Sequence, residues 1–346
     1  MLYIHRAICI SPQQTFGEIN IQNLKESVDK LHAIEPKYEA IPPGLLRRMG
    51  KAVRIGVGAA LPLIKESSAL DGIIIGTANG GMEDCIKFLN QIIDYEEGLL
   101  TPGNFVQSTS NAIASQIGLM SANKNYNITH VHRGLAFENA VIDAMMFARE
   151  SPAKKYLLGG VDEISAYNYN IDFLEGSYKK KPQSNATLFQ SASPGTIAGE
   201  ASAMFLVSGK KEDATAALSA ILVTQTDNVN AVKNQLKNFL ENNLATGEQI
   251  DSFVSGENGD NRLVEYYDAC ERVLADKTTV IRFKHMSGEF PTAPAFALWL
   301  ASYLINKNEV PAHAVKNAGT PKPFKKILIY NNYKGIQHSF MLVSNA

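Results

Sequence analysis

The sequence predicts an α/β fold in which short buried strands alternate with helices. Two observations carry this prediction: short apolar runs end in small residues or glycine, and amphipathic or fully apolar helical segments lie between these runs. Short apolar runs of this kind are typical of central strands that are buried on both faces of a sheet. Their alternation with helices is typical of a layered α/β architecture.

The expected elements follow in order. The segment MLYIHRAICI (1–10) is expected to form the first strand, and further strands are expected at 71–78, 154–163, 202–209, 250–259 and 326–332. Helices are expected between them because their apolar residues recur with helical spacing. The helices at 111–119 and 294–305 are apolar nearly all round and should be buried, whereas 229–243 should lie at the surface. The fourth expected helix, at 139–150, carries an apolar stripe.

The stretch 178–196 is rich in Lys, Ser, Pro and small polar residues, which predicts a long loop. A domain linker is the alternative, but strand-like sequence resumes at once, so we expect one compact unit over 1–346. Each half of the chain carries a strand that ends in Gly-rich sequence and is followed by apolar helices. This is compatible with two similar halves, at about 1–209 and 210–346.

Composition excludes several function classes. The chain has 33 basic and 34 acidic residues, a net charge of −1, which gives no support for binding nucleic acid or a membrane surface. No apolar run approaches the roughly 18 residues that span a bilayer, and the N-terminus lacks the features of a signal peptide. The cytoplasm is the expected location. The three cysteines are far apart and form no metal-binding pattern, so no metal and no cofactor are expected.

Several motifs, in a fixed order, cover nearly the whole chain. Together they resemble the β-ketoacyl synthase branch of the thiolase-like superfamily, and most closely its cysteine-less, chain-length-factor-type members. The resemblance implies a five-layer αβαβα fold with two similar halves. The motifs are RRMGKAVRIGVGAA (47–60), GTANGG (76–81), PGNFVQSTSNAIASQIGL (102–119), GGVDEIS (159–165), PGTIAGEASAMFLV (194–207), SGENGDNRLVEYYDA (255–269), FKHMSGEFPTAPAFAL (283–298) and YNNYKGIQHSFMLV (330–343).

The first departure from the family concerns its nucleophile. A ketosynthase carries its acyl group on a cysteine at a buried helix start, where the helix dipole favours the thiolate. VHRGLAFENA (131–140) resembles that helix start but has Arg133 at the nucleophile position, and a shift of one residue gives His132 or Gly134. A guanidinium stays protonated and is no nucleophile. We expect Arg133, or His132, to fill the former site, with an acidic partner chosen from Glu138, Glu257, Asp260 and Glu289; an Arg133–Glu289 ion pair is the specific prediction.

The remaining catalytic positions can be carried over one at a time. The resemblance implies two histidines that stabilise an enolate, and these positions fall on Ser255 and Glu289. The family's lysine is kept as Lys284. No catalytic set is therefore intact. The interface segment and the closing segment are expected to contribute substrate-pocket residues: Phe105, Ser108, Asn332, Tyr333, Lys334 and Gly335.

These departures lead to a functional expectation. The resemblance implies a non-catalytic partner of an active β-ketoacyl-ACP synthase, in bacterial fatty-acid, polyketide, aryl-polyene or flexirubin-type pigment synthesis. The expected partners are an active ketosynthase subunit and an acyl carrier protein, in a homodimer or heterodimer that pairs through the strand at 159–165 and the segment 105–111. Two alternatives stay open: an active 3-oxoacyl-ACP synthase or acyltransferase with atypical residues, and an acyl-ligand-binding protein. Whether the chain is an enzyme is left open by its sequence.

Overall fold

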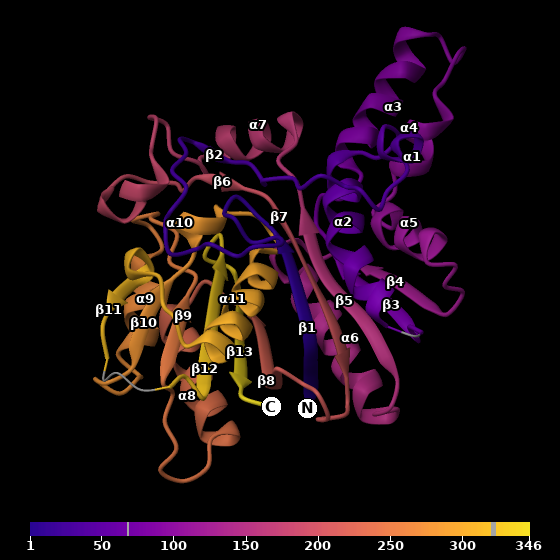
Figure 1. Cartoon of the computed structure of the whole chain (residues 1–346). Coiled ribbons are helices and arrows are strands. Elements are labelled where there is room, and N and C mark those ends of the chain that lie inside the picture. The colour runs from indigo at the N-terminus through magenta and orange to yellow at the C-terminus, as the bar shows by residue number, and fades with distance from the viewer. Residues whose placement is uncertain (68, 320–322) are drawn as a thin grey trace.

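The structure is a computed structural model that describes residues 1–67, 69–319 and 323–346. Its centre is an eleven-stranded mixed sheet (Figure 1). Read across the sheet, the strands are β11 (Val315–Asn317), β10 (Thr279–Arg282), β9 (Ser252–Ser255), β12 (Lys326–Tyr333), β13 (Gln337–Ser344), β8 (Ala216–Gln225), β1 (Leu2–Ile10), β7 (Ala201–Ser208), β5 (Lys155–Asp162), β3 (Gly72–Gly76) and β4 (Tyr126–His130). Two further strands, β2 (Lys30–Leu31) and β6 (Ala198–Gly199), pair with each other.

The two ends of the sheet repeat one topology. In the first half, β3 is parallel to β4 and β5, while β7 is antiparallel to β5 and β1. In the second half, β9 is parallel to β10 and β12, while β13 is antiparallel to β12 and β8. A short antiparallel pairing of β1 with β8 joins the halves. The predicted division near residue 209 falls between β7 and β8, and we retain it as a proposal.

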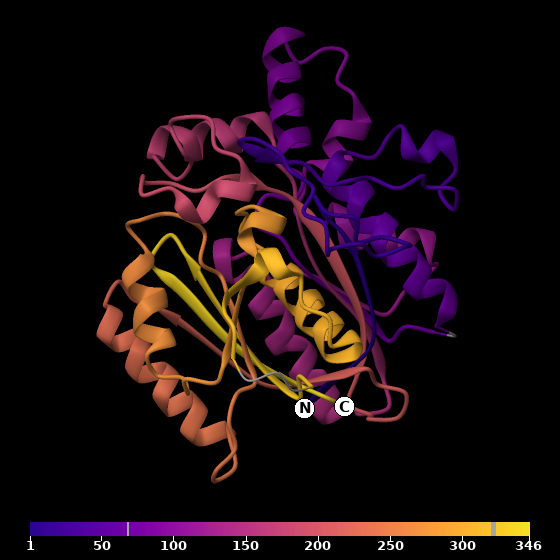
Figure 2. The ribbon, with the colours of Figure 1, turned by 60° about the vertical axis from the view of Figure 1, so that its left-hand side comes forward.

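Five layers result from this arrangement. Helices α6 (Ala136–Glu150) and α11 (Ala293–Lys307) lie between the halves and share one apolar core with both (Figures 1 and 2). On the outer face of the first half, α2 (Lys51–Glu66) and α5 (Ala112–Met120) enclose a second core. On the other side, α8 (Val229–Asn243) and α9 (Val264–Glu271) enclose a third. The remaining helices are α1 (Pro43–Leu46), α3 (Met82–Asp94), α4 (Pro102–Gln107), α7 (Ala166–Glu175), α10 (Lys284–Ser287) and the 3-10 turns η1 (Arg133–Leu135), η2 (Asn185–Gln190) and η3 (Ala312–Ala314).

The predicted alternation of strands and helices is confirmed, with one shortened strand. The strand expected at 250–259 ends at Ser255, and the residues after it form a loop. The stretch 178–196 is a loop, and the linker alternative is wrong because Asn185 in its middle is buried and donates to the backbone oxygen of His285 at 2.8 Å. No helix of the described residues is long and apolar enough to cross a membrane.

The structure also corrects the strand expected to pair between subunits. That strand, β5, lies inside the sheet and is hydrogen-bonded to β7 on one side and β3 on the other. It therefore has no edge to offer to a second chain. The edge strand of this half, in the part of the chain that the structure describes, is β4.

Candidate functional site

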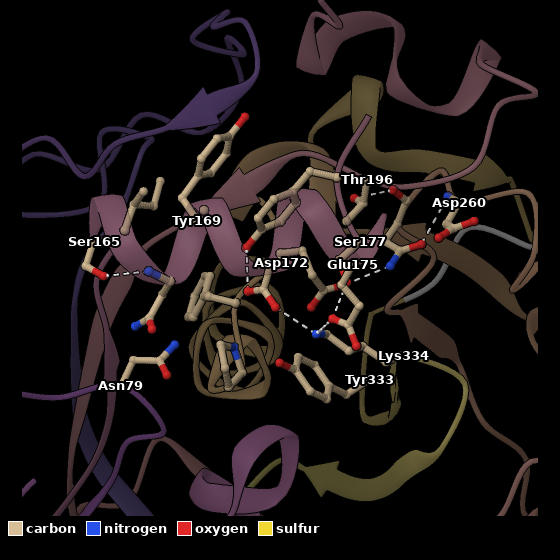
Figure 3. A pocket seen from close by; sticks show the side chains of 18 of the residues that line it. Asn79, Ser165, Tyr169, Asp172, Glu175, Ser177, Thr196, Asp260, Tyr333 and Lys334 are labelled. Carbon is tan, nitrogen blue, oxygen red and sulfur yellow. Dashed lines mark hydrogen bonds and ion pairs between the residues drawn. The ribbon is translucent and has the colours of Figure 1, made fainter. Parts of the chain in front are cut away.

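A cavity of about 340 Å³ opens where β5, β9 and β12 end (Figure 3). Its wall is polar and aromatic and is drawn from both halves of the chain. The lining residues are Asn79, Glu163, Ile164, Ser165, Asn168, Tyr169, Asp172, Glu175, Ser177, Tyr178, Thr196, Gly199, Asn258, Asp260, Arg262, Leu263, Glu289, Phe290, Pro291, Tyr333 and Lys334. Cavities with a few convergent polar groups are the usual places for ligand binding.

The entrance to α6 is covered by an aromatic ring from the other half. Gly134 is buried, and its N–H donates to Oε1 of Gln337 at 2.9 Å. A Cβ atom built on Gly134 would lie 2.3 Å from Cγ of Tyr333, so only glycine fits beneath this ring. Tyr333 itself lies in the cavity wall.

The residues expected to fill this entrance are exposed at its edge. Arg133 is exposed, with a φ of +49° at the start of the 3-10 turn η1. His132 is also exposed, and its ring nitrogens lie 2.9 Å from Nδ2 of Asn139 and 3.2 Å from Nε2 of Gln225. The expectation that Arg133 or His132 fills the site is not met, because both side chains are exposed and neither lines the cavity, although the charge of Arg133 still acts on Glu175 and Tyr333 in the cavity wall.

The predicted Arg133–Glu289 ion pair is also wrong. Oε1 of Glu289 lies 2.5 Å from Nζ of Lys284, and its Oε2 accepts from Nδ2 of Asn258 at 2.8 Å. Among the described residues Arg133 forms no ion pair. Burial lowers the pKa of Lys284, although the nearby Glu289 and Glu138 carboxylates oppose that shift. Glu289 and Lys284 meet because Lys284 begins the single-turn helix α10 and Glu289 follows shortly after its end.

Ser255, at one of the two expected histidine positions, and Glu138, a candidate acidic partner of Arg133, are buried in different surroundings. Ser255 ends β9, is fully buried and accepts the backbone N–H of Glu257 through its Oγ at 3.3 Å. Glu138 lies in the first turn of α6, also fully buried. Its Oε1 accepts from Oγ of Ser339 at 2.6 Å, while its Oε2 has no protein partner. Burial raises the pKa of Glu138 to about 7.

The expected substrate-pocket residues separate into two groups. Tyr333 and Lys334 line the cavity, whereas their neighbours Asn332 and Gly335 hydrogen-bond to each other behind it, from the Gly335 N–H to Oδ1 of Asn332 at 2.8 Å. Phe105 and Ser108 do not line the cavity. Phe105 lies on α4, is 59% exposed and packs against Phe88 of α3, with ring centroids 5.3 Å apart. Ser108 donates to the backbone oxygen of Phe105 at 2.7 Å.

Sequence reasoning missed Asp162, a buried carboxylate behind the cavity wall that accepts the backbone N–H of the lining residue Asn79. This buried carboxylate accepts five hydrogen bonds: Oδ1 from the hydroxyl of Thr77 and the backbone N–H groups of Ala78 and Asn79, and Oδ2 from the N–H and hydroxyl of Thr292. It thereby ties the turn after β3 to the start of α11. Its position at the end of the apolar strand KKYLLGGVD was the available signal, because a carboxylate there needs donors when it is buried.

The chemical capacity of the cavity follows from its lining. Of the residues that the structure describes, those in its wall include no cysteine and no histidine. Cys9 and Cys270 are buried elsewhere, and burial raises the pKa of each thiol to about 12. Cys85 lies on α3. The cavity can therefore hold a polar ligand, but its walls offer no thiolate to carry an acyl group.

The comparisons agree with this architecture. A family model described as the N-terminal domain of β-ketoacyl synthase matches residues 22–246. No curated protein matches the sequence. Three similar solved structures each span 100% of this chain: a β-ketoacyl synthase from Burkholderia phymatum STM815 (13% identity, 99% of that chain, TM-score 0.77), the complex of the ketosynthase ApeO with its chain length factor ApeC from Xenorhabdus doucetiae (13%, 98%, 0.77), and AntDE:AntF, a type II PKS acyl-carrier protein in complex with its ketosynthase (13%, 99%, 0.72).

At these identities the solved structures show the fold, which is the thiolase-like fold that the motifs predicted. Membership is shown by the family model, because it matches well over half of the residues. The chain belongs to the β-ketoacyl synthase family.

Proposed function

We propose that this chain is a non-catalytic, chain-length-factor-type partner of an active β-ketoacyl-ACP synthase. One observation carries the proposal: the cavity has neither a thiol nor an imidazole in its described lining, and at the start of α6 the expected acyl-attachment position is Arg133, followed by Gly134 beneath the ring of Tyr333. An acyl transfer needs an activated nucleophile, and a ring in contact with the helix start leaves no room for one.

The charged groups near the entrance support the same proposal. A ketosynthase stabilises developing negative charge with hydrogen-bond donors. Here the retained Lys284 is fully buried, and its ammonium group forms an ion pair with Glu289. At the position where the family has a hydrogen-bond donor for the enolate, this chain has the carboxylate of Glu289. The amide of Asn258 donates to the second oxygen of that carboxylate. Because Lys284, Glu289 and Asn258 are hydrogen-bonded to one another, their role is structural, and they do not form a site that stabilises an enolate.

The surface supports the partner role. Helices α3 and α4 project from the body beside the first half (Figure 1). They and their connection expose large apolar side chains, and large exposed apolar patches mark interaction sites. These side chains are Leu89, Ile93, Tyr95, Leu99, Phe105 and Val106. We propose that this surface, together with the β4 edge, contacts the active ketosynthase subunit.

The wider setting is part of the proposal. Structures of a ketosynthase with its chain length factor, and of an acyl-carrier protein with its ketosynthase, share this fold. They support a ketosynthase subunit and an acyl carrier protein as the partners. We propose a cytoplasmic complex that makes a bacterial fatty-acid, polyketide, aryl-polyene or flexirubin-type product.

Copurification tests the partnership. The chain, tagged at its own locus, is isolated from its native host, and the bound proteins are identified by mass spectrometry. The expected result is one dominant ketosynthase that contains a catalytic cysteine, in a one-to-one complex. Recovery of the chain alone or only with copies of itself, together with an unchanged product when its gene is deleted, would contradict the proposal.

Acylation tests the absence of chemistry. The complex and the chain alone are incubated with the N-acetylcysteamine thioester of octanoic acid, and intact masses are measured. An adduct is expected on the partner subunit and not on this chain. A stoichiometric adduct on this chain that maps to a single residue, Cys85 included, would favour an active acyltransferase with an atypical site instead.

The cavity itself favours a second candidate, an acyl-ligand-binding protein. Its space of about 340 Å³ could hold a small polar ligand without any reaction. Native mass spectrometry of the freshly purified chain distinguishes this candidate, since it predicts a bound small molecule of constant mass on the chain without a ketosynthase partner.

A further inference from the structure

Helix α7 lies over the cavity without being anchored by an apolar core. It supplies four residues of the wall: Asn168, Tyr169, Asp172 and Glu175 (Figure 3). None of its ten residues is buried, and Leu174 is 80% exposed. Elements with few buried apolar contacts open at a lower free energy than the core does. The position of α7 therefore depends on its polar contacts and on surface ring contacts, in which Tyr169 stacks on Tyr178 with ring centroids 5.1 Å apart and Nζ of Lys30 lies 3.6 Å from the Tyr169 ring centroid.

The ends of α7 are suited to movement. At its start, Ser165 is the N-cap, and its Oγ accepts the backbone N–H of Asn168 at 3.1 Å. At its end, Gly176 has a φ of +88°, a conformation that glycine adopts without strain. Such element-terminal residues are the usual hinges of a moving segment.

One side chain from the opposite half holds α7 in place. Lys334, in the turn between β12 and β13, places its Nζ 2.7 Å from Oδ1 of Asp172 and also contacts Oε2 of Glu175 (Figure 3). The φ of Lys334 is +56°, a region that residues other than glycine rarely occupy. A strained backbone that presents a doubly paired ammonium group is a feature that the surrounding structure must maintain.

A second charged contact crosses the same boundary. Nη2 of Arg262 donates to the backbone oxygen of Gly176 at 2.8 Å, while its guanidinium is held by Asp260. Arg262 and Asp260 both lie in the cavity wall, in the loop after β9. The helix is thus joined to the second half of the molecule by charged groups at its C-terminal end, and by none of its own apolar side chains in a core.

We propose that α7 is a lid over the cavity and that Lys334 is the clamp that keeps it shut. Opening would break ion pairs and hydrogen bonds that water can replace, together with the surface ring contacts of Tyr169, and it would expose no core. Because partly exposed ion pairs are screened by salt, the lid should open more often as ionic strength rises. The proposal concerns access to the cavity, so it holds whether or not this chain is a non-catalytic partner subunit.

Hydrogen exchange of the full chain tests the clamp. The variant Lys334→Met keeps the side-chain length and the backbone strain but removes the charge. Lys316→Met is the matched control, because Nζ of Lys316 also contacts more than one carboxylate, Glu257 at 2.7 Å, Glu271 at 2.9 Å and Asp268 at 3.9 Å, away from the cavity wall. Amides of 166–175 should exchange at least fivefold faster in Lys334→Met, and in wild type at 1 M NaCl, but not in Lys316→Met. Equal exchange in all three proteins, or no protection of α7 in wild type, would overturn the proposal.

Access to the cavity gives an independent measurement. Thr196 lies in the wall and is buried, so Thr196→Cys places a thiol inside the closed lid. Its labelling by iodoacetamide, mapped by peptide mass spectrometry, should be at least fivefold faster when Lys334→Met is added. Identical labelling rates would show that α7 does not control access. If Lys334→Met fails to fold, the pair Asp172→Asn and Glu175→Gln removes the same clamp from the other side.

Discussion

At the scale of single residues, the buried Lys284–Glu289 ion pair makes the clearest prediction about stability. Both groups are buried, so removal of one leaves the other uncompensated. We expect Lys284→Met to lower the free energy of unfolding by about 3–5 kcal/mol, measured by urea denaturation. The double variant Lys284→Met, Glu289→Leu should recover most of this loss, because an apolar pair can replace a buried ion pair. A single variant as stable as wild type would contradict the pairing.

Glu138 makes a prediction about alkaline pH. Burial raises the pKa of its carboxyl from 4.5 to about 7, so the folded chain binds this proton more tightly than the unfolded chain does. Its stabilising contribution is complete below pH 4.5 and is lost as pH rises through 7. Glu138→Gln should therefore be more stable than wild type at pH 8, by up to about 3 kcal/mol, and similar to it at pH 4.5. Urea midpoints across this range measure the difference, with the exposed Glu241→Gln as control; parallel curves for wild type and Glu138→Gln would refute the assignment.

At the scale of elements, helices α3 and α4 and the segment between them form an arm. Exposed residues of this arm can be changed to test partner binding without affecting folding. Ile93 and Leu99 are 75% and 91% exposed, so charged substitutions there remove little buried area. We expect the double variant Ile93→Asp, Leu99→Asp to keep the wild-type melting temperature within a few degrees but to lose the ketosynthase partner in copurification, a weakening of at least tenfold. Leu174→Asp on α7, equally exposed but outside the arm, should bind normally. Normal binding by the Ile93→Asp, Leu99→Asp variant would place the interface elsewhere.

At the scale of the whole molecule, buried histidines and Glu138 make stability depend on pH in opposite directions. Burial lowers the pKa of His338 to about 4 and that of His285 to about 3. A lowered histidine pKa gives stability that is complete above pH 6.5 and is lost as pH falls toward the folded value. Between pH 4.5 and 6.5 the histidine and Glu138 slopes therefore have opposite signs and partly cancel.

A variant of His338 isolates this contribution. His338→Gln can still donate to the backbone oxygen of Thr226, which the imidazole Nε2 contacts at 2.9 Å, but it cannot be protonated. We expect its stability to fall less than that of wild type between pH 6.5 and 4, by about 3 kcal/mol, in urea denaturation. The combination with Glu138→Gln should give the flattest profile. Acid unfolding that is unchanged in His338→Gln would locate the responsible groups elsewhere.

The sequence by itself determined the elements, their order and the family. The period of apolar residues reports the burial of a local segment, so α8 and β12 were predicted within a residue or so. It also predicted which catalytic residue types are replaced, since this prediction requires only the identities at motif positions. The strand at 250–259 was overextended because an apolar run does not reveal where a loop begins.

Only the tertiary structure decided how the replaced residues are used. Tyr333 meets Gly134, and Lys334 meets Asp172, across more than 150 residues of sequence. These contacts exist because α6 is enclosed between two halves whose strand order brings the β12–β13 turn to the helix start and to α7. Residue types and periodicity carry no information on such partners, because side-chain pairing depends on sheet order and register. The sequence therefore predicted an altered site, and the fold decided that the ring of Tyr333 lies against Gly134 and that Lys334 pairs with Asp172.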